Sequence, residues 1–182
     1  MGGFFGISSR RECLADVFFG TDYHSHLGTR RGGLAVWDKD LGLQREIHNI
    51  SNSPFRTKFE RVFEDMRGTS AIGAISDSDP QPLLIRSKLG TYAIATIGII
   101  NNVDYLLKEY FSHTLGHFNA MTGGQINSTE LVAALINQKD SFAEGIKFAN
   151  EVVDGTVSVL ILKEGGNIVA ARDKLGRIPV LV

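Results

Sequence analysis

The chain has 182 residues, of which 43% are hydrophobic and 21% charged, and its formal net charge is −1. This size and composition suit one globular domain and exclude an intrinsically disordered chain. Because acidic and basic residues are scattered along the sequence, we expect no binding to nucleic acid or to an anionic membrane surface. The sequence contains neither a run of about 20 apolar residues nor the pattern of a signal peptide. These features predict a cytoplasmic protein that does not enter a membrane.

The amino-terminal third of the sequence predicts a strand, a helix and a hairpin. Residues 2–7 are glycine-rich and apolar, which is typical of a buried strand, and we expect this strand to be central in its sheet. Helical spacing from Cys13 predicts a short helix that closes at Gly20. The segments 34–37 and 46–50 are predicted strands, and the polar turn between them indicates a hairpin.

A longer helix is predicted over residues 55–66. Ser53 is a suitable N-cap, and Pro54 suits the first turn of a helix. The stripe that follows repeats with helical spacing and comprises Phe55, Phe59, Val62, Phe63 and Met66. We interpret this stripe as part of the core.

The rest of the sequence alternates between groups of strands and groups of helices. Predicted strands cover residues 69–75, 83–86, 92–100, 157–162, 167–171 and 178–182, and predicted helices cover residues 103–110, 131–136 and 142–149. This order indicates an α+β fold with mainly antiparallel sheets, because a Rossmann fold would alternate strand and helix. The apolar residues 178–182 suggest that the natural protein continues beyond them.

Several polar motifs have simple structural interpretations. Asn127 and Glu130 predict a capping box at the start of a helix, and the adjacent glycines 123 and 124 predict a turn. The acidic segment 77–79 is typical of a solvated turn. Two histidine pairs lack a third ligand at suitable spacing, namely His24 with His26 and His113 with His117. We therefore predict no metal site and no cofactor.

Motifs from both ends of the chain resemble those of class II glutamine amidotransferases, and in particular those of the amidophosphoribosyltransferases. The opening segment 2–7 is similar to the Cys-Gly-hydrophobic-hydrophobic-Gly-Ile strand with which these enzymes begin. Similar motifs follow in the family's order at residues 26–29, 33–35, 81–82, 90–102, 127–130 and 170–176.

The resemblance implies a fold and a domain arrangement. The family has the amino-terminal nucleophile hydrolase fold, a four-layer αββα sandwich of two mainly antiparallel sheets, and we expect it over residues 1–182. It also implies that this chain is the amino-terminal part of a longer protein. A phosphoribosyltransferase domain would follow as its partner in the same chain, and the family allows a homo-oligomer.

The same resemblance implies that the catalytic groups are replaced. Gly2 stands at the position of the nucleophilic cysteine, whose α-amine acts as its base. Ile97 and Gly98 stand at the oxyanion positions, so only a backbone donor is retained. The family's charged substrate ligands fall on uncharged residues, namely Leu27, Ser76 and Ser128.

These replacements predict a degenerate amidotransferase-like domain that does not hydrolyse glutamine and has a structural or regulatory role. A second hypothesis is an active glutaminase with a relocated nucleophile, for which Ser8, Ser9 and Cys13 are the candidates. Cys13 lies beside Leu14 and Val17 on the apolar face of a predicted helix, which favours a buried, inert thiol. A third hypothesis is an independent scaffold that joins a partner complex.

Overall fold

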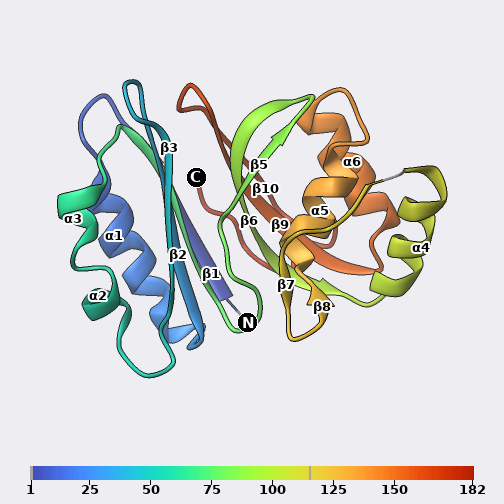
Figure 1. Ribbon diagram of the computed structural model, residues 1–182, viewed down its shortest axis with the longest axis horizontal. Coiled ribbons are helices and arrows are strands. Elements are labelled where there is room, and N and C mark those ends of the chain that lie inside the picture. The colour runs from blue at the N-terminus through green and yellow to red at the C-terminus, as the bar shows by residue number, and fades with distance from the viewer. Residues whose placement is uncertain (1, 115) are drawn as a thin grey trace.

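The computed structural model describes residues 2–114 and 116–182 and has four layers, with two sheets packed face to face between two layers of helices (Figure 1). The helices are α1 Leu14–Tyr23, α2 Phe55–Lys58, α3 Val62–Asp65, α4 Val103–His113, α5 Ser128–Ile136 and α6 Phe142–Val152, and the short 3₁₀ helix η1 covers His24–His26. The strands are β1 Gly2–Ser8, β2 Arg31–Asp38, β3 Gly42–Asn49, β4 Ser70–Ser76, β5 Leu83–Ser87, β6 Gly90–Ile100, β7 Met121–Thr122, β8 Gln125–Ile126, β9 Gly155–Lys163 and β10 Ile168–Ala171.

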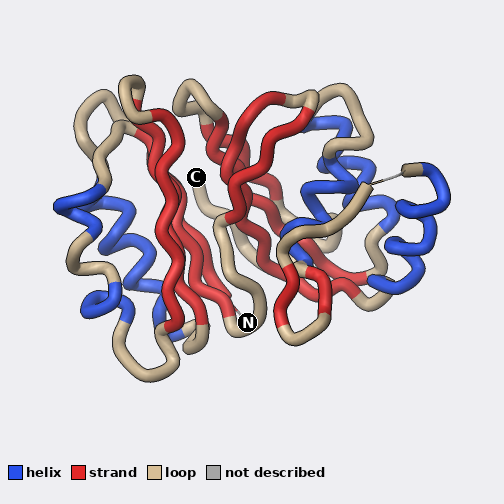
Figure 2. The backbone as a smooth tube through the Cα atoms, in the orientation of Figure 1, coloured by secondary structure: helices blue, strands red, loops and turns tan. Residues whose placement is uncertain are grey.

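Both large sheets are antiparallel throughout. The first has the strand order β1-β4-β2-β3 and the second the order β10-β9-β6-β5. Helices α1, α2 and α3 cover the outer face of the first sheet, and α4, α5 and α6 lie on the side of the second (Figures 1 and 2). The predicted four-layer αββα sandwich is therefore confirmed.

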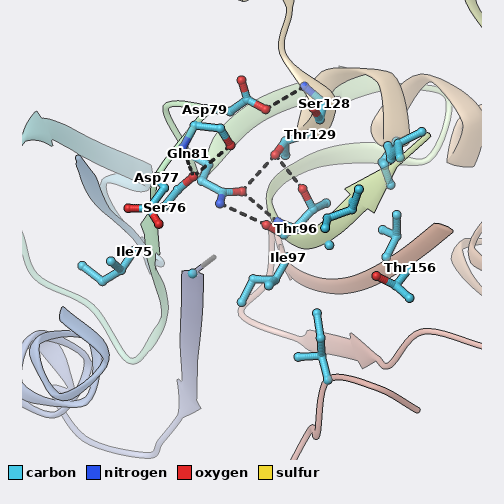
Figure 3. A pocket seen from close by; sticks show the side chains of 18 of the residues that line it. Ile75, Ser76, Asp77, Asp79, Gln81, Thr96, Ile97, Ser128, Thr129 and Thr156 are labelled. Carbon is cyan, nitrogen blue, oxygen red and sulfur yellow. Dashed lines mark hydrogen bonds between the residues drawn. The ribbon is translucent and has the colours of Figure 1, made fainter. Parts of the chain in front are cut away.

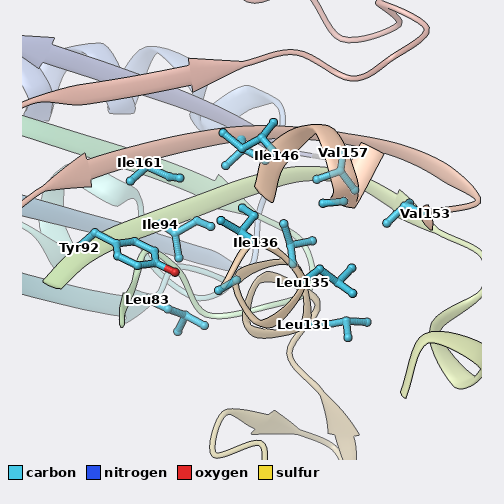
Figure 4. Close-up of a cluster of buried hydrophobic side chains, with 14 of the residues drawn as sticks. Leu83, Tyr92, Ile94, Leu131, Leu135, Ile136, Ile146, Val153, Val157 and Ile161 are labelled. Atoms are coloured by element: carbon cyan, nitrogen blue, oxygen red, sulfur yellow. The ribbon is translucent and has the colours of Figure 1, made fainter. Parts of the chain in front are cut away.

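The core is divided among the three interfaces between layers. Small side chains dominate the interface between the sheets, where Ala35, Ala74, Ala93 and Ala95 lie with three larger aliphatic residues. The interface below α1, α2 and α3 is aromatic and contains Phe18, Phe55 and Phe59. The interface below α5 and α6 is mainly aliphatic (Figure 4). Small residues between the sheets allow the backbones to approach closely, and larger residues fill the space below the helices.

The prediction that the amino-terminal strand is central and buried is wrong. Strand β1 is an edge strand that pairs only with β4, and Gly3 is its one fully buried residue. The strand is nevertheless covered on both faces. A Cβ at Gly20 of α1 would lie 2.5 Å from the ring of Phe5, and a Cβ at Gly6 would lie 3.2 Å from Leu160 of the other sheet. This coverage on two faces explains the apolar, glycine-rich sequence.

The first helix does not close at Gly20 as predicted, because α1 continues to Tyr23. Gly20 lies inside the helix, where the ring of Phe5 leaves no room for a side chain. Glycine at this position therefore serves the contact between helix and strand, and it does not act as a C-cap.

The single helix predicted over residues 55–66 is also wrong, because the segment forms two separate turns, α2 and α3. Phe55, Phe59, Val62 and Met66 are buried as the stripe predicted, but Phe63 is 48% exposed. Phe55 and Phe59 stack with their ring centroids 4.3 Å apart. Two turns docked on a sheet bury residues at this spacing as well as one helix does, so the periodicity could not distinguish the two arrangements.

Residues 178–182 do not form the predicted strand, and they contain no regular element. The N–H of Ile178 donates to the carboxylate of Asp173 at 3.1 Å, so this hydrogen-bond donor is not available to a sheet. Pro179 has no N–H to donate, and Leu181 is 94% exposed. Apolar composition without a neighbouring strand edge does not produce a strand. The other predicted strands and helices are present with boundaries shifted by a few residues.

Candidate functional site

A cavity of about 570 Å³ lies where the two sheets meet the start of α5. Its walls are formed by the start of β1, the end of β4 and the segment after it, the second half of β6, and the first residues of α5 and β9 (Figure 3). Arg177 and Ile178 from the carboxyl-terminal segment complete the lining. The cavity therefore gathers residues from all parts of the sequence.

Five of the six predicted site positions line this cavity: Gly2, Ser76, Ile97, Gly98 and Ser128. The antiparallel register brings the first two together, since Gly2 pairs with Ser76. The sixth position, Leu27, lies at the end of η1 outside the lining and is 38% exposed. The structure thus assembles most of the site that the resemblance indicated.

Gly2 has no space for a side chain. A Cβ built on this residue would lie 2.4 Å from the carbonyl oxygen of Ile75. Contacts between a Cβ and a backbone atom at this distance require the backbone to shift, because interiors are closely packed. The position of the family's nucleophile is therefore closed to a cysteine unless strand β1 or β4 moves.

The side chain of Gln81 organises the polar wall of the cavity (Figure 3). Its Nε2 donates to the carbonyl of Thr96 at 3.0 Å, and its Oε1 accepts from the N–H of Thr96 at 2.8 Å. Oε1 also accepts from the hydroxyl of Thr129 at 2.9 Å, and the Thr96 and Thr129 hydroxyls are 2.7 Å apart. Because Gln81 is 3% exposed, this network is a fixed part of the wall.

The two acids of the segment 77–79 are used to hold neighbouring segments. Asp77 accepts from the N–H of Thr29 at 2.8 Å, and Asp79 accepts from the N–H of Ser128 at 3.0 Å. Across residues 2–114 and 116–182, no group of three or more His, Cys, Asp and Glu side chains is arranged to hold a metal ion. The sequence alone did not indicate the link between Asp79 and Ser128, which are 49 residues apart.

The predicted capping box at the start of α5 is half correct. Asn127 is the N-cap, and its side chain accepts from the N–H groups of Thr129 and Glu130. The carboxylate of Glu130 instead accepts from the N–H groups of Asn119 and Ala120, at 2.9 and 2.7 Å. Glu130 therefore fixes the segment that leads into β7, and the predicted turn at glycines 123 and 124 follows between β7 and β8.

The candidate alternative nucleophiles lie away from the cavity. Ser8 is at the opposite end of β1 from Gly2, and its Oγ is 3.0 Å from that of Ser70. Neither Ser9 nor Cys13 is among the residues that line the cavity. None of the three can therefore act on a ligand bound there.

Cys13 is expected to react slowly with thiol reagents in the folded chain. It is fully buried, and burial, with smaller contributions from the charges of Glu12 and Asp16, raises the pKa of its thiol to about 11. Because the thiolate is the reactive form, few thiol groups are reactive at neutral pH. Labelling with a chromogenic disulfide should be slow in buffer and fast in denaturant. Equal rates in both conditions would contradict this assignment.

No family model matches the chain. The amidophosphoribosyltransferase of Methanocaldococcus jannaschii is 27% identical over 192 residues, which cover 100% of this chain and 40% of that protein. The structure of the glutamine phosphoribosylpyrophosphate amidotransferase from B. subtilis, complexed with ADP and GMP, superposes with a TM-score of 0.77 at 23% identity. A structure described as the allosteric regulatory enzyme of purine biosynthesis gives a TM-score of 0.76 at 22% identity. Each of the two structural alignments covers 95% of this chain and 37% of the chain in the solved structure.

The two antiparallel sheets between layers of helices match the amino-terminal nucleophile hydrolase-like fold of these solved structures. More particularly, the chain is homologous to the amino-terminal glutamine amidotransferase domain of amidophosphoribosyltransferase. It spans about 40% of the length of the curated relative that it matches. Among the described residues, no helix is long and apolar enough to span a membrane.

Proposed function

We propose that this chain is a degenerate glutamine amidotransferase-like domain that does not hydrolyse glutamine. The observation that carries the proposal is the closed position at Gly2, where a Cβ would lie 2.4 Å from the carbonyl oxygen of Ile75. Nucleophilic catalysis needs a side chain that can attack the amide carbon and a base that can take its proton. Glycine supplies no such side chain, and its surroundings leave no room for one.

The remaining groups of the cavity also argue against glutamine hydrolysis. Ile97 presents an alkyl side chain where the family has an amide donor, and losing one oxyanion donor costs about 10² to 10³ in rate. Among the described residues that line the cavity, the single Lys or Arg is Arg177, and the same lining contains two acids, Asp77 and Asp79. This balance of charge disfavours the α-carboxylate of an amino acid, which normally binds to an arginine.

We further propose a structural or regulatory role for this domain toward a phosphoribosyltransferase domain in the same protein. The length of the relative supports this role, because this chain accounts for 40% of it. We also propose a cytoplasmic location and a place in purine biosynthesis, and the same homology supports both. A domain with such a role needs to keep its fold and its cavity but not a nucleophile.

A glutaminase assay tests the proposal. Ammonia release from glutamine should stay at background for the chain and for its Gly2→Cys variant, because the new side chain meets Ile75 and the substrate still lacks charged partners. A variant with Gly2→Cys, Ile97→Asn, Ser76→Arg and Ser128→Asp restores four groups together. Activity in this variant alone would identify the loss of these four groups as the cause of inactivity. Positioning of the substrate against the catalytic groups can lower the barrier by several kcal/mol, about 7 in favourable cases.

The Cys13→Ala variant is the control for a relocated nucleophile. It should behave as the unmodified chain does, with neither showing ammonia release above background. Strong activity in the unmodified chain that disappears in Cys13→Ala would overturn the proposal and make Cys13 the nucleophile. Strong activity that persists in Cys13→Ala would also overturn the proposal, and Ser8 and Ser9 would then be the remaining candidate nucleophiles.

A further inference from the structure

A second cavity, of about 470 Å³, lies at one side of the sandwich and shares no lining residue with the first. Its lining includes residues of β3 and β5, which are edge strands of the first and the second sheet. Figure 1 shows where these two strands lie. Tyr110 of α4, the segment before β7 and one side of α5 form the remaining walls. The volume is within the range of pockets that hold small molecules in proteins, about 300 to 1,000 Å³.

Two arginines from different sheets line this cavity. Arg45 comes from β3 and Arg86 from β5. Neither side chain forms a hydrogen bond or an ion pair with another residue of the described part of the chain, whereas Arg56 pairs with Asp22 and Lys88 with Asp140. Guanidinium groups that line one cavity without acidic partners favour an anionic ligand.

The one acid in the lining is already engaged. The carboxylate of Glu130 accepts from the N–H groups of Asn119 and Ala120 and so holds one wall in place. The charges of the two arginines therefore exceed that of the single acid by one. Asn137 adds donor capacity, because its Oδ1 accepts from the hydroxyl of Tyr92 and leaves its amide N–H groups available.

The donors favour a phosphate group over a single carboxylate. A phosphate monoester carries a charge of about −1.5 to −2 at pH 7 and three acceptor oxygens, so two guanidinium groups can bind it together. A carboxylate has two oxygens, which one guanidinium group satisfies. The walls also include Leu83, Ile85 and the ring of Phe118, which suit the organic part of a ligand.

We propose that the second cavity binds a small organic phosphate, with Arg45 and Arg86 holding the phosphate group. Glu130 acts as a positioning residue that fixes the wall formed by residues 119 and 120. The site is independent of the proposed loss of glutaminase activity, because the two cavities have no residue in common.

Calorimetric titration with glucose 6-phosphate tests the site, with glucose as the uncharged probe and inorganic phosphate as the probe without an organic part. We expect glucose 6-phosphate to bind at millimolar concentration or below, more tightly than inorganic phosphate, and glucose not to bind. Arg45→Gln and Arg86→Gln should each weaken binding about tenfold or more, which corresponds to the loss of one charged hydrogen-bonding partner. Both residues are exposed, so the variants should retain the circular dichroism spectrum of the unmodified chain.

Two further variants make the test specific. Arg10→Gln, an exposed arginine outside both cavities, should leave binding unchanged, and so should Arg177→Gln in the first cavity. Failure of all three probes to bind at millimolar concentration would overturn the proposal. Loss of binding in Arg177→Gln but not in Arg45→Gln would also overturn it, because the ligand would then occupy the first cavity. Malonate could bind in a manner that depends on both arginines while neither phosphate probe binds. This result would overturn the assignment of a phosphate ligand and would identify a dicarboxylate as the ligand class.

Discussion

Removal of residues 2–8 is expected to abolish the cooperative unfolding transition of this chain. Strand β1 forms seven registered pairs with β4, and β4 is buried along its full length. Without β1, one edge of β4 would expose unpaired backbone groups in a region that otherwise excludes water. Phe5 and Ile7 would also leave the aromatic interface below α1. Both side chains are partly buried, so each contributes less than the about 1.5 to 3 kcal/mol of a fully buried one. This loss adds to that of the backbone ladder, against a total stability of about 5 to 15 kcal/mol.

Thermal unfolding followed by circular dichroism measures this effect. The matched control is removal of residues 179–182, which form no regular element and end in strongly exposed residues. This second truncation should leave the midpoint within a few degrees of that of the full chain. A cooperative transition that persists after removal of residues 2–8 would show that β1 is dispensable for the fold.

Gly73→Ala is expected to be among the most destabilising single substitutions in the chain. A Cβ at this position would lie 1.8 Å from the Oγ1 of Thr21 and 2.8 Å from a methyl group of Leu34. Thr21 belongs to α1 and is fully buried, so the clash would push the helix away from the sheet. Overpacking typically costs about 1 to 3 kcal/mol, and a contact this short should reach the upper end of that range or exceed it.

A second substitution at the same contact provides the control. The hydroxyl of Thr21 is buried without a hydrogen-bond partner among the described residues. Thr21→Ala alone should therefore cost little, because it leaves no buried group unpaired. The double variant should recover part of the stability lost in Gly73→Ala, as measured by a double-mutant cycle of unfolding free energies. Purely additive effects would contradict the contact.

The sequence was sufficient to predict most strands and an antiparallel α+β class, because the signals for the strands are local, whereas the four layers were implied by the resemblance to the class II glutamine amidotransferases. The hairpin of β2 and β3, for example, follows from two apolar runs around a polar turn. The place of β1 within its sheet depends on which distant strands pair with β4, and the sequence contains no local signal for that choice. The same holds for residues 55–66, where one helix and two turns bury the same side chains.

Prediction of the first cavity from the sequence was limited in a similar way. The motifs that resemble the glutamine amidotransferases located five of the residues that line it, including Gly2 and Ser128. They did not indicate that Gly2 lies against the carbonyl of Ile75, since this contact depends on the register of β1 on β4. The second cavity was missed because Arg45 and Arg86 belong to strands of different sheets, and only the stacking of the sheets brings them to one cavity.

The network around Gln81 restricts which residue can occupy that position. Leu83 pairs with Ile94 in the antiparallel ladder, so the same register would place residue 81 opposite Thr96. The carboxamide of Gln81 takes this place and imitates a peptide group, since it donates to the carbonyl of Thr96 and accepts from its N–H. Glutamate would lack the donor, asparagine is one methylene shorter, and an aliphatic residue would leave both backbone groups of Thr96 unpaired. The identity of residue 81 is thus dictated by the chemistry of the backbone that it completes, whether or not a ligand ever enters the cavity beside it.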